Sequence, residues 1–258
     1  MELHDWLRPD WTAPQAHAFM TTRAGGVSKD GFHSLNLGRS VGDTPSAVAE
    51  NRRRVAAAIG ATPVFLKQVH GNKVLTLEPA YATPGADPEP ADASISLDPT
   101  LACAVMVADC LPVLFATARG VGAAHAGWRG LSSGVLENTV QVLCETTGCD
   151  PDQIQAWMGA SIGPQAFEVG ADVLQAFGVE PQPRDQPLFR FQPNTAGEPR
   201  WRADLYGLAR QRLTQAGLRQ VYGGGWCTFS EPSRFFSYRH EQVDGRPGGR
   251  MAAVIRLR

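Results

Sequence analysis

The feature that most constrains the fold is a set of short, almost uninterrupted apolar runs near the middle of the chain. The segments "ACAVMVA" (102–108) and "PVLFAT" (112–117) are followed closely by "GVGAAH" (120–125). A strand with water on one face alternates apolar and polar residues, whereas a strand covered on both faces is apolar throughout. These runs therefore predict strands buried on both faces. With 258 residues and 43% hydrophobic content, the chain can build a large core.

Helices and strands are mixed along the rest of the chain. Segments with apolar residues at helical spacing predict helices over 46–59, 132–147 and 203–216. Further strands are predicted over 63–69, 72–77, 154–160 and 251–257. Because no regular β-α repeat appears, we expect a layered α/β or α+β fold rather than an eight-fold barrel.

Two stretches rich in proline, glycine and polar residues interrupt this pattern, at 78–92 and 179–200. Their composition predicts surface loops. The segments beyond them are not self-sufficient cores, so we interpret these stretches as loops within one domain rather than linkers between two. We therefore expect a single domain spanning residues 1–258.

Composition excludes several classes of function. The net charge of -1 argues against nucleic acid as a partner. No run approaches the roughly 18 apolar residues that suggest a membrane span. The five cysteines are odd in number, which disfavours a disulfide framework and favours a reducing compartment. The N-terminal segment "MELHDWLRPDW" does not resemble a signal peptide, so we expect a cytoplasmic protein.

Three residues of the metal-ligand type lie at the ends of these apolar runs: His70 in "KQVHGNK", Cys110 in "VADCLP" and His125 in "AAHAGWRG". Thiolate and neutral imidazole are favoured ligands of Zn²⁺, and three protein ligands leave the open position typical of a catalytic site. Zinc in such a site lowers the pKa of a bound water to about 7. Cu²⁺ fits the same ligands.

The residues by themselves leave an alternative open. The separations of 40 and 15 residues match no short zinc motif. In a Cys–His nucleophile pair without metal, Cys110 would attack the substrate and His125 or His70 would act as the base. Asp109 precedes Cys110, and adjacent residues of a strand point to opposite faces, so we expect Asp109 to orient its neighbours.

At these motifs the sequence resembles the bacterial YfiH-type family, also described as "laccase domain" or "polyphenol oxidase" proteins. The two most specific matches are "VADCLPVLF" (107–115) and "AAHAGWRG" (123–130), in this order and spacing. Further matches run through most of the chain, among them "SLNLGRSVGD" (34–43), "KQVHGNKV" (67–74) and "SIGPQAFEVG" (161–170).

The resemblance implies a single α/β/β/α layered domain that is monomeric and binds one zinc ion through His70, Cys110 and His125. It also implies phosphorolysis of purine nucleosides (adenosine, inosine, guanosine and methylthioadenosine) and deamination of adenosine. Some bacterial members resemble peptidoglycan editing factors, which remove a wrongly incorporated L-serine from a muropeptide precursor. That reaction is the alternative function, through the zinc site or through a Cys–His pair.

The nucleoside reaction requires a cationic clamp for phosphate and groups that hold the nucleoside. The candidates for the clamp are Arg52 in the "RRR" run and Arg129, four residues past His125. Asn36 and Gln68 are the candidates for contacts with the ribose or the base. We expect the partners to be the purine nucleoside and phosphate.

The sequence departs from the family pattern at three positions. Gln165 stands where many members carry Cys or Ser, Phe167 where Tyr is common, and His240 where a second Arg is usual. We expect these departures to affect substrate detail and to leave the metal ligands unchanged.

Two other functions are less favoured. A multicopper oxidase needs many histidines, mostly in His-x-His pairs, but this chain has six histidines and no such pair. A copper polyphenol oxidase is therefore disfavoured. A structural zinc module that acts through partners is the remaining hypothesis, and it predicts unfolding when zinc is removed.

Overall fold

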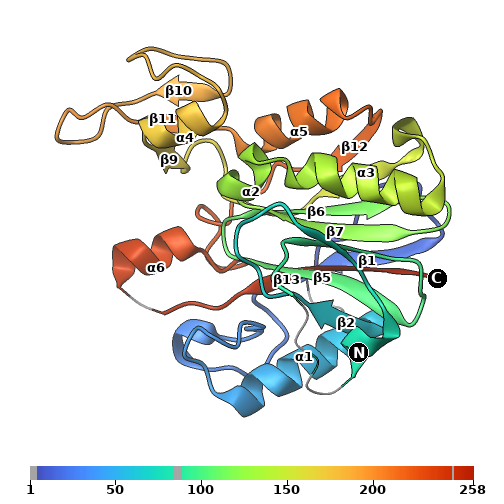
Figure 1. Ribbon diagram of the computed structural model, residues 1–258. Helices are drawn as coiled ribbons and strands as arrows, with labels where there is room; N and C mark the ends of the chain where they lie inside the picture. The colour runs from blue at the N-terminus through green and yellow to red at the C-terminus, as the bar shows by residue number, and fades with distance from the viewer. Residues whose placement is uncertain (1–4, 84–85, 87–88, 246) are drawn as a thin grey trace.

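Two β-sheets pack face to face, and helices cover the outer face of each sheet. The computed structural model describes residues 5–83, 86, 89–245 and 247–258. Figure 1 shows the layers in order, with α3 and α5 above the β6–β7 sheet, the β5–β13 sheet below it, and α1 beneath. This is the α/β/β/α arrangement that the family resemblance implies, and it agrees with the layered fold expected from the residues.

The larger sheet has the strand order β12-β8-β6-β7-β4-β3. Its strands are β12 (Gln220–Gly223), β8 (Gln155–Met158), β6 (Leu111–Ala116), β7 (Val121–Ala126), β4 (Ala93–Ser96) and β3 (Val74–Thr76). The second sheet has the order β1-β13-β5-β2. Its strands are β1 (Ala16–Met20), β13 (Met251–Leu257), β5 (Leu101–Val107) and β2 (Thr62–Phe65).

The helices lie outside the sheets or connect them. The three longest are α1 (Pro45–Ile59), α3 (Val135–Thr147) and α5 (Leu205–Gln215), and the shorter ones are α2 (Trp128–Ser132), α4 (Ala171–Ala176) and α6 (Tyr238–Asp244). Single 3-10 turns are η1 (Asp30–Phe32), η2 (Pro79–Ala82) and η3 (Pro151–Gln153). Among the described residues, no helix combines the length and hydrophobicity that a membrane crossing needs.

The apolar runs are buried on both faces, as predicted. In β5, Cys103 and Val105 pack between the two sheets, while Ala102 and Ala104 belong to the core between α1 and this sheet. Successive side chains of a strand point to opposite faces, so one strand serves both cores. Small alanines face the helix and larger residues fill the gap between the sheets.

The first and third predicted helices are confirmed as α1 and α5, but the second is divided. Gly134 adopts the left-handed conformation with φ of 96°, so α2 ends before it and α3 begins after it. A residue with a Cβ rarely adopts this conformation, and glycine permits the break. The prediction of one helix over 132–147 was wrong in this respect.

The polar stretch 179–200 is more ordered than a surface loop. It contains β10 (Phe189–Phe191), which pairs with β11 (Trp201–Ala203), and β11 pairs in turn with β9 (Glu168–Val169). The buried rings of Phe189 and Trp201 pack with the core beneath α3 and α5. In Figure 1 this small sheet projects from the body of the molecule beside α4.

Candidate metal centre

His70, Cys110 and His125 converge at one end of the gap between the two sheets. The ligand-type atoms of the three side chains all lie within 4.8 Å of one another. Cys110 occupies the turn between β5 and β6, and His125 is the penultimate residue of β7. His125 is almost fully buried, whereas His70 is exposed. The three residues grouped from the sequence therefore form one cluster.

His70 does not end a strand, contrary to the sequence prediction. β2 stops at Phe65, and His70 lies in the loop beyond it with a left-handed φ of 60°. Three successive backbone N–H groups, those of Val69, His70 and Gly71, donate to the carboxylate of Asp92 at 2.7–3.0 Å. The carboxylate compensates these donors and holds the loop in this uncommon conformation.

The same carboxylate also orients His125. Asp92 Oδ1 lies 2.8 Å from His125 Nδ1, and the His125 backbone N–H donates to the Asp92 carbonyl at 2.7 Å. An ionised carboxylate accepts hydrogen bonds, so the neutral form of His125 carries its proton on Nδ1 and presents Nε2 to the cluster. Asp92 is fully buried and connects both histidines.

Asp92 was not among the residues singled out from the sequence. It lies at the end of the polar stretch 78–92, which was interpreted only as a surface loop. The available signal was its position directly before β4, where a charged residue enters a buried strand. A buried carboxylate needs several hydrogen-bond donors, so an acid at such a place indicates a built site.

Gly127, two residues after His125, leaves space for the other two members of the cluster. A Cβ at this position would lie 2.9 Å from Cys110 Sγ and 3.0 Å from a ring carbon of His70. The contact with Cys110 is shorter than side chains tolerate, and the contact with His70 is tight enough to require that ring to move. The glycine therefore allows the chain after β7 to pass directly beside Cys110 and His70.

The charges within the cluster favour the ionised thiol. Burial opposes ionisation of Cys110, but the charge and hydrogen bonds of His125 and His70 outweigh it and lower the pKa of the thiol to about 6. Burial alone would lower the pKa of His125, but the charges of Cys110 and Asp92 raise it. A thiolate beside imidazole groups is the state that binds a metal ion or acts as a nucleophile.

The donor set fits a divalent metal ion. In tetrahedral zinc sites with bonds of roughly 2.0–2.3 Å, donor atoms lie roughly 3.3–3.8 Å apart. Cys110 Sγ and His70 Nε2 are 3.8 Å apart, and all three donors lie within 4.8 Å. Two imidazoles and one thiolate can therefore hold a metal ion with little rearrangement.

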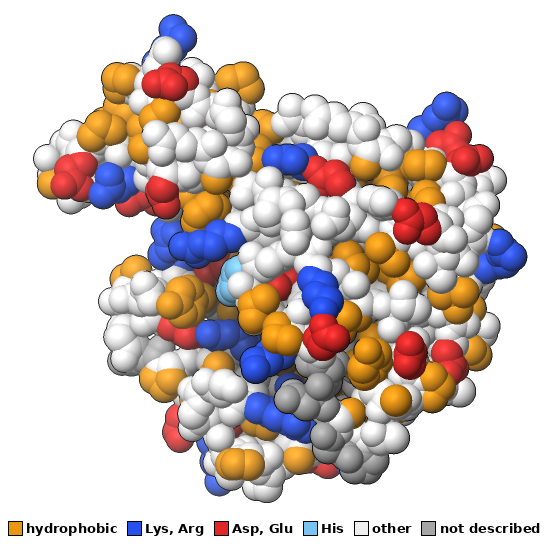
Figure 2. Space-filling model, viewed as in Figure 1, with side chains coloured by type: hydrophobic (Ala, Val, Ile, Leu, Met, Phe, Trp, Pro, Cys, Tyr) orange, Lys and Arg blue, Asp and Glu red, His pale blue; other side chains and the backbone are white. Residues whose placement is uncertain are grey.

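A cavity of about 910 Å³ opens onto the cluster. Its cationic lining residues are Arg39, Arg52, Lys67, Arg129 and Arg250, and its described lining contains no carboxylate. Figure 2 shows this hollow, with a histidine visible between groups of blue Lys and Arg side chains. A cavity with several cations and no acid favours an anionic ligand.

Arg52 is the cation that the fold leaves most in need of an anion. Its Nε donates to the Leu37 carbonyl at 2.9 Å, and its guanidinium lies 4.1 Å from the ring centre of Phe65. Burial, and then the nearby charge of Arg39, lower its pKa to about 10. No carboxylate among the described residues pairs with it, so a bound anion would compensate this partly buried charge.

Two other residues predicted to bind substrate also line the cavity. Arg129 is the second residue of α2, next to Trp128, and its guanidinium lies 4.4 Å from the Trp128 ring. Gln68 lies at the cavity wall, but its side-chain amide is already hydrogen-bonded within the protein. Both of its polar atoms bond to the backbone of Met106 at 2.8–2.9 Å and extend the pairing of β2 with β5.

Asn36 is fully buried and is absent from the described residues that line the cavity. Its Nδ2 donates to Gly38 and Asp43, and its Oδ1 accepts from the N–H groups of Gly38 and Arg250. All of its hydrogen-bonding capacity is used within the protein. The structure thus brings Arg52, Gln68 and Arg129 together at the cavity and places Asn36 behind its wall.

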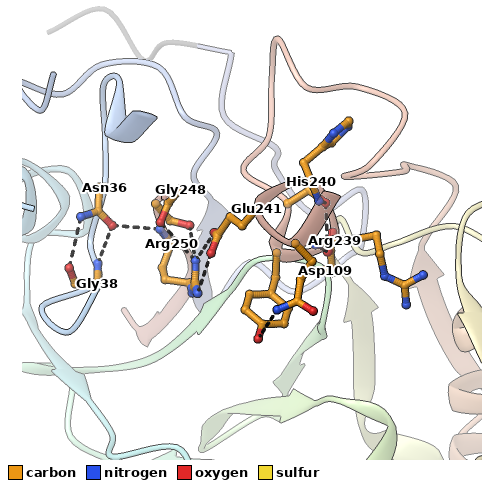
Figure 3. A network of polar contacts seen from close by, with 12 residues as sticks. Asn36, Gly38, Asp109, Arg239, His240, Glu241, Gly248 and Arg250 are labelled. Carbon is orange, nitrogen blue, oxygen red and sulfur yellow. Dashed lines mark hydrogen bonds and ion pairs between the residues drawn. The ribbon is translucent and has the colours of Figure 1, made fainter. Parts of the chain in front are cut away.

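Helix α6 forms another part of the wall, through Tyr238, and is anchored beside Cys110. The carboxylate of Asp109 accepts hydrogen bonds from the Ser237 hydroxyl, the Arg239 N–H and the Thr228 hydroxyl at 2.5–2.9 Å. Figure 3 shows Arg250 reaching Glu241 of α6 on one side and Asn36 on the other. Asp109 therefore orients its neighbours, in agreement with the sequence interpretation.

The three departures from the family pattern lie away from the cavity lining. Gln165 accepts a hydrogen bond from Arg190 at 3.0 Å, next to the small sheet. Phe167 packs against the core beneath α3 and α5. His240 stacks on Phe229 with ring centres 4.2 Å apart. None of the three is among the described residues that line the cavity.

Comparisons with known proteins agree on one family. A family model described as "Multi-copper polyphenol oxidoreductase laccase" matches residues 17–258. A purine nucleoside phosphorylase of Pseudomonas aeruginosa is 47% identical, with 95% of this chain and 96% of that protein covered. The purine nucleoside phosphorylase YfiH of Escherichia coli is 46% identical, with 96% and 97% covered. A crystal structure of a Neisseria meningitidis protein superimposes with a TM-score of 0.85 at 44% identity, covering 98% of both chains.

Proposed function

The chain belongs to the family described as multi-copper polyphenol oxidoreductase laccase, which includes the YfiH-type proteins, and we propose that it is a zinc-dependent purine nucleoside phosphorylase. The observation that carries the proposal is the cavity, which joins Arg52, a partly buried cation with no carboxylate partner among the described residues, to the His70–Cys110–His125 cluster. The relatives named purine nucleoside phosphorylase, at 46–47% identity, support the same reaction.

In this proposal Arg52 and Arg129 bind the attacking phosphate. Guanidinium groups form paired hydrogen bonds with phosphate oxygens and neutralise their charge. Phosphate forms a bond to the sugar carbon while the bond from that carbon to the purine breaks, and the electron pair leaves with the base. Tyr238 and the ring of Phe65 line the cavity and offer apolar surface to the nucleoside.

The metal ligands have a separate role. Zinc, when bound by His70, Cys110 and His125, supplies a Lewis acid with an open position that stabilises negative charge. Asp92 keeps the proton of His125 on Nδ1 and fixes the loop that carries His70. The burial of His125 keeps water from this side of the cluster. We propose deamination of adenosine as a second activity of the same centre.

The available metal-binding side chains do not support a multicopper oxidase. Among the described residues, the ligand-type side chains form one cluster of three or more, at His70, Cys110 and His125. An electron relay through several coppers needs additional ligand groups. A single Cu²⁺ in this cluster remains compatible with its nitrogen and thiolate donors.

A second candidate function rests on a different observation. Cys110, His125 and Asp92 follow the order of nucleophile, base and orienting acid, and the Cys110 thiol has a lowered pKa. The cavity of about 910 Å³ is near the upper end of the usual range for small-molecule sites. Both features would suit hydrolysis of a muropeptide amide. In either case we propose a monomeric, cytoplasmic enzyme whose substrates are small molecules.

The test measures metal content and turnover on the same sample. The purified protein is assayed with adenosine or inosine, with and without phosphate, and the free base, ribose 1-phosphate and deaminated products are quantified. One zinc per chain with phosphate-dependent release of the base is the expected result. Zinc without nucleoside turnover would favour the muropeptide amide, and thiol-dependent hydrolysis that a chelator leaves intact would favour the nucleophile pair.

A pair of neighbouring arginines tests the phosphate clamp. Arg52→Met should raise the KM for phosphate about tenfold or more while zinc content stays at the wild-type level, because a charge-assisted hydrogen bond is lost. Arg53→Met is the matched control, since Arg53 is 68% exposed and pairs with Glu50. Equal KM values for phosphate in the two variants would show that Arg52 does not bind the attacking phosphate.

A further inference from the structure

Two of the five cysteines touch at the end of α3, opposite the metal centre. Cys144 lies in the last turn of α3 and Cys149 follows the helix, and their sulfur atoms are 4.0 Å apart. Thr147, between them, accepts a hydrogen bond from Arg119, which precedes β7. His125 lies at the other end of β7, so the pair is remote from the cavity.

The end of the helix explains this contact. Gly148 adopts the left-handed conformation with φ of 70°, and its N–H donates to the Cys144 carbonyl at 2.8 Å. This glycine cap turns the chain back over the last helical turn and commonly brings the residue after it against the helix. An apolar pair would suffice for packing, but two thiols in this place can also react with each other.

We propose that Cys144 and Cys149 form a reversible thiol–disulfide site that reacts with low-molecular-weight disulfides. The sulfur of Cys149 attacks one sulfur of the reagent and releases one thiol. Cys144 then attacks the Cys149 sulfur of the mixed disulfide and releases the second thiol. In total the two cysteines lose two protons and two electrons, and the reagent disulfide is reduced to two thiols.

Geometry and charge support this order. Closing the gap from 4.0 Å to the S–S bond length needs a shift of roughly 2 Å, which side-chain rotation can supply. Burial, and then the charge of Cys149, raise the pKa of Cys144 to about 11. Once Cys149 is part of a mixed disulfide its charge is gone, so Cys144 ionises more readily when it has to attack.

The surroundings favour this pair over the other cysteines. Cys149 and Cys144 are both partly exposed, and Cys144 also lines a groove of about 550 Å³ between α3 and α5. Cys103 is fully buried, and burial raises its pKa to about 12. Cys110 belongs to the metal cluster. Cys227 is partly exposed, and its sulfur accepts backbone N–H groups of Gly163 and Ser230.

The test treats the zinc-loaded protein with oxidised glutathione and with the neutral bis(2-hydroxyethyl) disulfide, traps free thiols, and maps the peptides by mass spectrometry. Wild-type protein should lose two hydrogen atoms in mass through a Cys144–Cys149 disulfide, and a thiol reductant should reverse the change. Cys144→Ser should accumulate the mixed disulfide at Cys149. Cys227→Ser, the matched control, should behave as wild type.

Oxidation should raise the Tm by roughly 2–5 °C, because the disulfide closes only a short loop. Nucleoside turnover should stay unchanged, since the pair lies at the far end of β7 from His125. A persistent mixed disulfide on wild-type protein, or modification of Cys227 in preference to the pair, would overturn the proposal. These outcomes do not depend on which reaction the metal centre performs.

Discussion

At the scale of single residues, one carboxylate organises the candidate metal centre. Asp92 accepts hydrogen bonds from three backbone N–H groups around His70 and from the ring of His125. Two of the three candidate ligands therefore depend on a residue that is not itself one of them. Such partners tune both the orientation and the basicity of the ligands.

The variant Asp92→Asn tests this dependence. The amide keeps the size of the carboxylate, but its NH₂ group faces donors and cannot accept from them. Affinity for zinc, measured by competition with a chromophoric chelator, should fall about 10–100-fold. Asp98→Asn is the control, because Asp98 accepts its bonds from Thr100 in the turn before β5. Wild-type affinity in Asp92→Asn would show that the histidines are held by other groups.

A second substitution tests the space beside the ligands. Gly127→Ala places a methyl group 2.9 Å from Cys110 Sγ and 3.0 Å from the His70 ring, so it should displace both ligands and lower zinc affinity at least tenfold. In Gly71→Ala the new Cβ would meet only ordinary contacts, at 3.6 Å and beyond. That variant should bind zinc as wild type does, and equal losses in both would point to general strain.

The sequence correctly grouped His70, Cys110 and His125 as neighbours, but it gave the wrong local structure for His70. A left-handed residue held by a carboxylate 22 positions later leaves no local signature, because the compensating contact is made in the tertiary structure. Asn36, which the sequence suggested as a substrate contact, also depends on tertiary contacts that the sequence does not reveal. A turn asparagine near a motif resembles a ligand contact, and only its four hydrogen bonds inside the fold reveal its role.

At the scale of elements, helix α6 connects the metal centre to the cavity wall. Its first turn is fixed by Asp109, next to Cys110, and Tyr238 of the same turn lines the cavity. Asp109 itself has a left-handed φ of 83°. The placement of α6 and that of the thiol are thus coupled through adjacent residues.

Removal of this anchor should loosen α6. Asp109→Ala leaves the N–H of Arg239 and two hydroxyls without their acceptor, so we expect a loss of about 2–4 kcal/mol in the free energy of unfolding by urea. Amide exchange over 238–244 should accelerate. Asp244→Ala, at the exposed end of α6, should change the free energy of unfolding by no more than about 0.5 kcal/mol and leave the amide exchange rates of α6 as in the wild type. Unchanged protection of α6 in Asp109→Ala would mean that Arg250 and Glu241 suffice to hold it.

The elements also show which parts of the fold the sequence could predict. Long apolar runs such as those of β5 and β6 identified their strands, because every residue of a strand that is buried on both faces tends to be apolar. The short strands β9, β10 and β11 span only two or three residues each, and their stability comes from rings such as Phe189 and Trp201 packed on the core. Periodicity cannot be detected over so few residues, so the composition of 179–200 favoured a loop where β10 lies, and β9 and β11 were not predicted.

At the scale of the whole molecule, the core is built from apolar side chains, and its buried residues, among those described, do not include the His70–Cys110–His125 cluster. One apolar cluster lies between α1 and the β5–β13 sheet, a second between the two sheets, and a third between the β6–β7 sheet and helices α3 and α5. The ligands lie at one end of the gap between the sheets, and the contacts of Asp92 already hold both histidines in place. A structural zinc module lacks such independent support and unfolds when its metal is removed.

Removal of the metal therefore distinguishes the catalytic from the structural hypothesis. Dialysis against a strong chelator should abolish nucleoside turnover, while far-UV circular dichroism and a cooperative melting transition are retained. The Tm should fall by roughly 10 °C, the shift expected when a tightly bound ligand leaves a chain of this size. Because the hydrogen bonds of Asp92 keep the ligands arranged, added zinc should restore turnover without a refolding step. Loss of the circular dichroism signal on chelation would instead show that the metal holds the sheets together.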